Sequence, residues 1–334
     1  MPNNPQPPVI VGSGRFVYEA LPVWERLPAG MSFYEAVSVA TDSRGRVYVF
    51  NRGEHPVIVL ERDGSFVRSW GEGMFKRAHG IWIGPDDLLY LTDDLDHTVS
   101  KYTPEGKLLL TLGSSGQASD SGCRDFDYRT ITHGGAPFNF PTDLALNAAG
   151  EMFVADGYGN ARVHKFSPDG ALLRSWGEPG SGPGQFNLPH GIGVDRSGRV
   201  FVADRENNRL QIFSPDGEYL AEWTGLVRPT EVFIDRDDVV YVTELGRRAG
   251  MFPWMKPDLQ STGGRVSIFD HDGQLLARWG GGDHPCSPGD FHTPHDIWVD
   301  AHGDVYVAQV TMSGGGKQGL IPADCPSFTK YVRR

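Results

Sequence analysis

A unit of about 40 residues repeats six times along the chain, and this repeat constrains the fold more than any other feature. The two clearest copies occupy residues 138–176 and 186–223 and match almost residue for residue. Each contains four short runs of β-branched and aromatic residues separated by turn sequences such as RSG and PDG. A four-stranded meander of this length cannot bury its faces alone and stacks into a ring. The sequence therefore predicts an all-β, six-bladed β-propeller that spans residues 1–334 as a single domain.

Two irregularities in the repeat suggest how the ring closes and where it carries a site. The last copy contains only three strands, so residues 15–24 are expected to supply its outer strand and leave no sheet edge open. Insertions interrupt the repeat at residues 114–137, 245–264 and 311–327. We expect all three to emerge on one face, because long loops gathered on a rigid ring usually frame a binding site.

Composition limits the possible partners. The formal net charge is −11, which disfavours nucleic acid, because that affinity comes from clustered lysine and arginine. No apolar run reaches the ~18–20 residues that a membrane span needs, so no membrane partner is expected. Three cysteines without C-x-x-C spacing, and an N-terminus without a signal-peptide pattern, favour the cytoplasm. A surface pair between Cys286 and Cys325 stays open at this point.

One aligned position, at the start of the first strand of each repeat, carries histidine in every second copy. In chain order its residues are Val37, His79, Thr142, His190, Thr230 and His295. Alternate blades of a six-fold ring would direct the three imidazoles at one axis. Three neutral imidazoles with an open fourth position are typical of a catalytic zinc site, with Zn–N distances of about 2.0–2.1 Å. The other eight histidines fall off this register and are assigned structural or surface roles.

A second position, at the end of the second strand, faces the same rim, because an antiparallel hairpin brings these two points together. It carries Arg52, Tyr158 and Arg205 in the first, third and fourth repeats. From position alone, surface ion pairs for the arginines and rim packing for the tyrosine remain alternatives to a role in a site.

The repeats DRENNRLQIFSPDGEYL and DGYGNARVHKFSPDG resemble NHL repeats. More narrowly, LPHGIGVD with ADREN, PTDLAL with DGYGN, AHGIWI and TPHDIWVD resemble the peptidyl-α-hydroxyglycine α-amidating lyase domain, from about residue 37 to the C-terminus. This resemblance implies a zinc- and calcium-binding six-bladed propeller of NHL-type four-stranded blades. It also implies cleavage of a carbinolamide, R-CO-NH-CH(OH)-COOH, to a primary amide and glyoxylate.

Carried over by position, the resemblance implies a role for each residue of the site. Zinc would be held by His79, His190 and His295. Tyr158 would be the catalytic base, and Arg52 and Arg205 the active-site arginines. The structural calcium would take the backbone carbonyls of Val39 and Ile81 and the carboxylate of Asp296, hard oxygen ligands of the kind that calcium prefers.

Three functions remain open from the sequence. The first is a zinc-dependent carbon–nitrogen lyase acting on a peptidyl-α-hydroxyglycine or a related small compound, so the partner would be a small molecule or short peptide. The second is a zinc-dependent hydrolase of esters, lactones or phosphotriesters that uses the same site to activate water. The third is a non-enzymatic NHL binding platform, because a fold alone does not fix a function.

Overall fold

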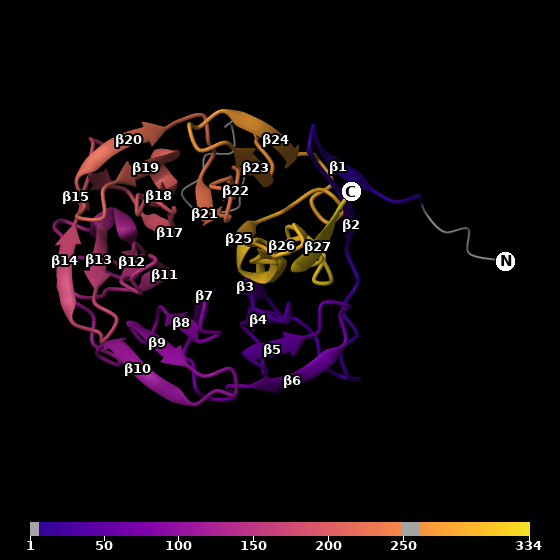
Figure 1. Cartoon of the computed structure of the whole chain (residues 1–334), viewed down its shortest axis with the longest axis horizontal. Helices are drawn as coiled ribbons and strands as arrows, with labels where there is room; N and C mark the ends of the chain where they lie inside the picture. The colour runs from indigo at the N-terminus through magenta and orange to yellow at the C-terminus, as the bar shows by residue number, and fades with distance from the viewer. Residues whose placement is uncertain (1–6, 249–260) are drawn as a thin grey trace.

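Six antiparallel sheets stand around a central axis like the blades of a propeller (Figure 1). The computed structural model describes residues 7–248 and 261–334. In each blade the first strand lies nearest the axis, and in blades one to five the fourth lies at the periphery. The all-β, six-bladed propeller predicted from the repeat is confirmed.

The first three blades follow the repeat in order. Blade one is β3 (Ala36–Thr41), β4 (Val47–Asn51), β5 (Val57–Leu60) and β6 (Phe66–Trp70). Blade two is β7 (Ala78–Ile83), β8 (Leu89–Asp93), β9 (Thr98–Tyr102) and β10 (Leu108–Gly113). Blade three is β11 (Pro141–Leu146), β12 (Met152–Asp156), β13 (Arg162–Phe166) and β14 (Leu172–Trp176). The first insertion lies between blades two and three and contains the short 3-10 helix η1 (Tyr128–Thr130).

The next two blades have the same plan. Blade four is β17 (Pro189–Val194), β18 (Val200–Asp204), β19 (Arg209–Phe213) and β20 (Tyr219–Trp223). It is preceded by the small parallel pair β15 (Glu178–Pro179) and β16 (Gln185–Phe186), and η2 (Arg205–Asn207) follows β18. Blade five is β21 (Pro229–Ile234), β22 (Val240–Glu244), β23 (Arg265–Phe269) and β24 (Leu275–Gly280).

Blade six joins the two ends of the chain. Its first three strands are β25 (Pro294–Val299), β26 (Val305–Gln309) and β27 (Phe328–Arg333), with α1 (Thr311–Gly314) and η3 (Gly316–Gln318) in the insertion after β26. The fourth strand is β2 (Phe16–Leu21), which pairs antiparallel with β27, as the incomplete last repeat predicts. The structure adds a fifth, outermost strand, β1 (Ile10–Ser13), that the repeat does not predict.

Contacts between blades recur because the repeat places a tryptophan and a glycine at matching points. Trp70, Trp176 and Trp223 end the fourth strands of three blades. Each faces the turn glycine of the next blade, respectively Gly106, Gly217 and Gly273. These glycines have positive φ, and an added Cβ would lie within 2.7–2.8 Å of the tryptophan ring. A side chain there would push neighbouring blades apart, so the PDG-type turn matters for ring packing as well as for the hairpin.

Strand register then explains why two positions of the repeat meet at one rim. Ala36 pairs with Asn51, Pro141 with Asp156 and Pro189 with Asp204, so each first strand begins where the second ends. The residue after each first-strand start and the residues after each second-strand end therefore share one mouth of the central channel.

Candidate metal centre

The three predicted histidines converge on the axis. Each is the second residue of an innermost strand, in β7, β17 and β25. One ligand atom from each of His79, His190 and His295 lies within 4.8 Å of the others, and the ring centroids are 4.7–5.0 Å apart. All three side chains are buried. The convergence predicted from the alternating repeat is therefore confirmed.

The intervening blades orient these imidazoles. His79 Nδ1 lies 2.6 Å from the carbonyl of Thr142, and His190 Nδ1 lies 2.7 Å from that of Thr230. His295 Nδ1 lies 2.8 Å from the carbonyl of Val37. Each acceptor is the aligned residue of the next blade around the ring. Because Nδ1–H donates outward, each Nε2 keeps a lone pair directed at the axis, as metal-ligating histidines do.

The chemistry of this donor set fits a divalent metal ion. Burial lowers the pKa of all three histidines well below the ordinary value. Neighbouring imidazoles lower the pKa of His79 and His190 further, and nearby arginines do so for all three. Neutral imidazole is the form that binds metal. In addition, the buried Nε2 of His295 has no hydrogen-bond partner among the described residues. An orphaned buried nitrogen is costly in a folded protein, and a metal ion would satisfy it.

Tyr158, which follows β12, stands beside this trio. Its hydroxyl lies 3.2 Å from Nε2 of His79 and 3.1 Å from Nε2 of His190. The ring of Phe126, from the first insertion, stacks on it at a centroid distance of 5.4 Å. The guanidinium groups of Arg77 and Arg205 lie 5.7 Å and 5.5 Å from its ring centroid. A proton-transferring hydroxyl therefore adjoins any group held at the histidines, with two cations close by.

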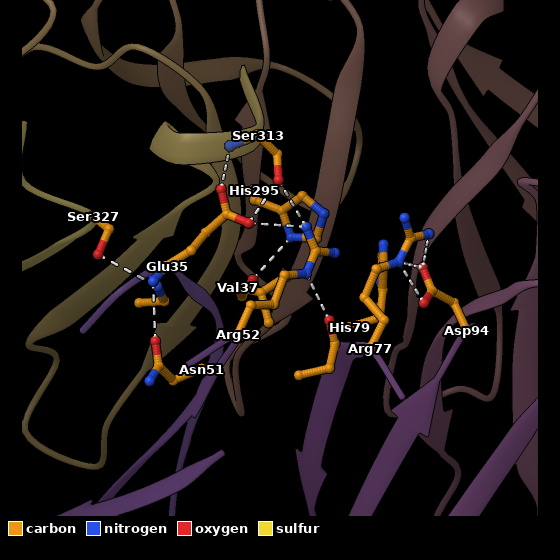
Figure 2. Close-up of polar contacts among 12 residues, drawn as sticks. Glu35, Val37, Asn51, Arg52, Arg77, His79, Asp94, His295, Ser313 and Ser327 are labelled. Atoms are coloured by element: carbon orange, nitrogen blue, oxygen red, sulfur yellow. Dashed lines mark hydrogen bonds and ion pairs between the residues drawn. The ribbon is translucent and has the colours of Figure 1, made fainter. Parts of the chain in front are cut away.

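Arg52 comes from the end of β4 and is fixed by a buried carboxylate. Its Nε donates to the carbonyl of Ala78 at 2.8 Å, and its Nη1 pairs with Glu35 at 3.1 Å (Figure 2). Glu35 is 1% exposed and also accepts hydrogen bonds from the backbone N–H and hydroxyl of Ser313 in α1. Glu35 thus joins an arginine of blade one to the third insertion and holds both at the mouth.

Arg205 begins η2 and has a different charge environment. Glu206 pairs with Arg205 at 2.9 Å and with the fully buried Arg228 at 2.7 Å. Burial raises the pKa of Glu206, but the two arginines outweigh it and the net shift is downward. One ionised carboxylate therefore contacts two guanidinium groups at this corner of the pocket.

The sequence analysis missed a third arginine in the pocket. Arg77 forms a bidentate ion pair with the buried Asp94, and Asp94 keeps the pKa of Arg77 raised despite its burial (Figure 2). A signal was available, because Arg77 lies two residues before the aligned position. The same offset gives Glu35, which pairs with Arg52, Thr293, which lines the pocket, and Arg228, which contacts the Glu206 carboxylate that pairs with Arg205.

These groups enclose a cavity of about 190 Å³, small for a ligand pocket. All three insertions contribute side chains to its wall. The described lining residues are Arg52, Arg77, Phe126, Tyr128, Tyr158, Arg205, Thr230, Leu245, Thr293, His295, Val310, Ser313 and Gly314. The expectation that the insertions share one face is borne out for these residues, while positions 249–260 of the second insertion lie outside the described part of the chain.

The residues expected at a calcium site lie one or two positions further along the inner strands than the aligned position that carries the histidines. The Asp296 carboxylate accepts from the N–H of Val39 at 3.2 Å and from the hydroxyl of Ser38. Ser38 in turn accepts from the N–H of Ile81 at 2.9 Å. Val39, Ile81 and Asp296 are therefore neighbours across three blades.

Two further acids that the sequence analysis did not single out, Asp143 and Glu231, occupy the same position as Asp296 in blades three and five. Burial raises the pKa of Asp143 to about 7. Burial and the neighbouring acids raise the pKa of Glu231 and Asp296 well above the ordinary value. A buried layer of carboxylates suits a hard cation. Among the described residues, however, only the histidine trio brings three ligand atoms within 4.8 Å of one another.

The cysteine pair left open by the sequence is bonded. Cys286, in the loop before β25, and Cys325, in the third insertion, form a disulfide. It ties that insertion to the segment that leads into His295. Cys123 is free. In the part of the chain that the structure describes, no helix has the length and apolar character required to cross a bilayer.

Comparisons with known proteins agree with the repeat. The NHL repeat family model matches residues 138–166 and 186–213. NHL repeat-containing protein 3 of Mus musculus is 37% identical over 198 residues, which cover 55% of this chain and 54% of that protein. Peptidyl-alpha-hydroxyglycine alpha-amidating lyase 1 of Drosophila melanogaster is 29% identical over 293 residues, 80% of this chain and 50% of that protein. The chain thus spans about half the length of these relatives.

Among solved structures, a gluconolactonase from Xanthomonas campestris superposes with a TM-score of 0.61 at 14% identity, covering 99% of this chain and 96% of the other. At 14% identity, this likeness shows the fold alone. The chain is therefore a six-bladed propeller that contains two matches to the NHL repeat and is similar in sequence to peptidyl-α-hydroxyglycine α-amidating lyases.

Proposed function

We propose that this NHL-repeat propeller is a zinc-dependent lyase that cleaves the C–N bond of a carbinolamide to a primary amide and glyoxylate. The observation that carries the proposal is the position of the Tyr158 hydroxyl, 3.1–3.2 Å from two of three converging histidines and inside an arginine-lined cavity. The similarity to proteins named as lyases of this chemistry supports it.

His79, His190 and His295 would hold the zinc ion through Nε2. When bound, zinc would act as a Lewis acid that makes the substrate hydroxyl more acidic. Tyr158 is the group placed to take the hydroxyl proton, because its oxygen adjoins the histidine nitrogens. The guanidinium groups of Arg77 and Arg205 lie 5.7 Å and 5.5 Å from its ring centroid, so two cations stand beside the reacting groups.

The reaction balances without water. As the O–H bond breaks, its electron pair forms the new C=O bond of glyoxylate and the C–N bond breaks toward nitrogen. The departing amide nitrogen needs one proton, and Tyr158 can return the one it has taken. Substrate and products therefore differ only by this internal transfer.

The charges around the cavity distinguish the roles of the arginines. Arg52 is paired with Glu35, and Arg77 with Asp94. Arg205 is buried, lines the cavity and holds its guanidinium 5.5 Å from the Tyr158 ring centroid, where it can form charged hydrogen bonds to a substrate carboxylate. We therefore assign the binding of the substrate carboxylate to Arg205. Arg52 stays a candidate for orienting the amide carbonyl of the substrate beside His295.

The small cavity and its apolar wall favour a short acyl group. Phe126, Tyr128 and Leu245 line the cavity, and all three belong to insertions. We expect a small N-acyl-α-hydroxyglycine, or the end of a short peptide, as substrate.

The direct test is release of glyoxylate from α-hydroxyhippurate by the zinc-loaded protein. Stoichiometric benzamide and glyoxylate, lost in the Tyr158→Phe variant, are expected. Hydrolysis of 4-nitrophenyl acetate or of a lactone, with no glyoxylate from α-hydroxyhippurate, would contradict the lyase and favour a zinc hydrolase instead.

We further propose that Asp296 and the carbonyls of Val39 and Ile81 hold a structural calcium ion. The supporting observation is the buried carboxylate layer that includes Asp143 and Glu231. Elemental analysis of protein purified without chelator should give one calcium per chain, reduced in the Asp296→Asn variant. Unchanged calcium content in that variant would contradict this assignment.

The cytoplasmic location stays a prediction. The Cys286–Cys325 disulfide weighs against it, because such bonds persist mainly in oxidising compartments. Fractionation of the native host, with thiol trapping of the pair, would decide between the two locations.

A further inference from the structure

The channel has a second cavity at its opposite end. It measures about 730 Å³ and is lined by the ends of the first strands and the short turns that follow them. None of its lining residues lines the cavity at the histidines. We call the mouth at the histidines the histidine end and this one, around Trp82, Phe233 and Trp298, the aromatic end.

Three aromatic rings form the floor of this cavity. Trp82, Phe233 and Trp298 all lie three residues after the aligned position, in blades two, five and six. Their ring centroids are 5.1 Å apart for Trp82 and Trp298, 4.8 Å for Phe233 and Trp298, and 6.4 Å for Trp82 and Phe233. Blades two and five stand opposite each other (Figure 1), so these rings meet on the axis.

The other three blades carry small residues at this position, Ala40, Ala145 and Gly193. They leave room for three large rings without overpacking. Trp298 is fixed in place because its Nε1–H donates to the Thr41 hydroxyl at 2.8 Å. Trp82 remains half-buried and lines the cavity. Phe233 and Trp298 are only 8% and 9% exposed, so Trp82 offers most of the accessible aromatic surface of this preformed floor.

The rim carries two cations without partners. Arg44 and Arg236 are exposed, line the cavity and make no side-chain hydrogen bond or ion pair within the described residues. The two carboxylates on the same rim are already engaged. Asp42 accepts from the N–H groups of Arg44 and Arg46 at 3.0 and 2.8 Å and from the Tyr48 hydroxyl at 3.3 Å.

Asp87 likewise accepts from the N–H and the hydroxyl of Ser43, both at 2.7 Å. Both oxygens of each carboxylate are thus occupied by the turns. Asp42 and Asp87 keep their charge, but the rim side chains that remain free to bind a ligand, among the described residues, are the guanidinium groups of Arg44 and Arg236 and the imidazole of His302. The three floor rings are tilted by 36–70° to one another, so the floor offers face and edge contacts to an aromatic ring, and the unpaired guanidinium groups above it can bind a carboxylate on that ring.

We propose that the aromatic end is a second ligand site, which binds a small planar aromatic carboxylate with its ring on Trp82, Phe233 and Trp298 and its carboxylate toward Arg44 and Arg236. This site is independent of the proposed lyase function, because the two cavities share no residue. The ligand needs both groups, because the aromatic floor contacts its ring and the guanidinium groups on the rim contact its carboxylate.

The test is calorimetric titration of the full chain with indole-3-acetate, with indole-3-acetamide as the neutral analogue of the same shape. Binding of the acid in the micromolar to low millimolar range is expected, at least about tenfold tighter than the amide, since hydrogen bonds to charged groups are the stronger ones. The Arg44→Ala/Arg236→Ala double variant should lose this preference and bind both compounds equally weakly.

Arg196→Ala is the matched control. Arg196 occupies the same turn position in blade four as Arg236 in blade five, but it pairs with Asp238 and lies outside the cavity. This variant should bind like the unaltered chain. Tyr158→Phe and Arg205→Met should also leave binding unchanged.

Several results would overturn the proposal. One is equal affinity for acid and amide, and another is no binding up to about 5 mM, beyond the weak millimolar range. Binding that survives the double variant but falls in Arg205→Met would place the ligand at the histidine end instead. Failure of the lyase assay does not affect these outcomes, because none of them depends on turnover.

Discussion

The two ends of the channel are formed by the same six inner strands, yet they are built differently. At the histidine end the long insertions close over the axis and supply Phe126, Leu245 and Ser313. At the aromatic end each first strand passes directly into a short turn, and the cavity stays wide. The comparison teaches that the repeat brings side chains of different blades together on the axis at both ends. The insertions, which depart from the repeat, are what narrows the cavity at the histidine end.

Symmetry also differs between the ends. The histidine layer follows a strict alternation, with each imidazole oriented by a carbonyl of the next blade. The aromatic layer places its large residues in blades two, five and six, without alternation. A single metal ion is bound by equivalent ligands arranged around it, whereas the aromatic floor needs only enough rings to cover the axis.

The largest expected effect separates chemistry from structure at the histidine end. Tyr158→Phe should lower kcat on α-hydroxyhippurate by about 10²–10⁴-fold, the usual contribution of a general acid or base, while zinc content stays unchanged. Tyr90→Phe, which alters a buried tyrosine of β8 outside the cavity, is the control. A loss of less than threefold for Tyr158→Phe would remove this hydroxyl from the mechanism.

A smaller effect should come from the charge at the Arg205 corner. Arg205→Met should raise KM by roughly 10–100-fold, because a charged hydrogen bond to the substrate carboxylate is lost. Arg199→Met, in the same blade but paired with Asp195 away from the cavity, should change KM little. If Arg52→Met raised KM more than Arg205→Met did, the carboxylate would have to be reassigned to Arg52.

The next prediction concerns the disulfide at the histidine end and its contribution to the free energy of unfolding. Removing it in a Cys286→Ser/Cys325→Ser variant should lower the free energy of unfolding by about 2–4 kcal/mol, given a sequence separation of 39 residues. Chemical denaturation measures this change. Binding of indole-3-acetate at the aromatic end should not respond, and a parallel loss there would mean that the two ends are mechanically coupled.

The smallest expected effect concerns the buried acids between the two ends. Their pKa values are raised in the folded state, so they stabilise the metal-free fold at low pH, and this contribution is lost as pH rises through about 7 for Asp143. In chelator the melting temperature should therefore fall by a few degrees between about pH 5.5 and pH 8. Asp143→Asn should flatten that slope, and calcium should restore stability at the higher pH. A melting temperature that rises over this range would contradict the buried placement of these carboxylates.

Sequence reasoning reached the ring and the histidine layer because both follow from a repeat. His79, His190 and His295 share one register, and strand pairing converts that register into a common point in space. Arg52, Tyr158 and Arg205 were found for the same reason, since hairpin register brings the end of strand two to the start of strand one.

The remaining site residues depend on contacts that no single register contains. Phe126 and Ser313 reach the mouth through insertions whose path the repeat does not determine. Glu35 and Arg77 each lie just before the first strand of a blade, two residues before the aligned position. The alternating histidines draw attention to the aligned position itself and not to its neighbours. The pairing of Cys286 with Cys325 depends on how the third insertion folds back, so sequence could only leave it open.

The most direct test of the account is a crystal structure of the purified protein with anomalous data at the zinc absorption edge. We expect one zinc ion per chain, bound to Nε2 of His79, His190 and His295 and lying beside the Tyr158 hydroxyl. Anomalous density elsewhere, or a vacant trio in protein supplied with zinc, would contradict the account.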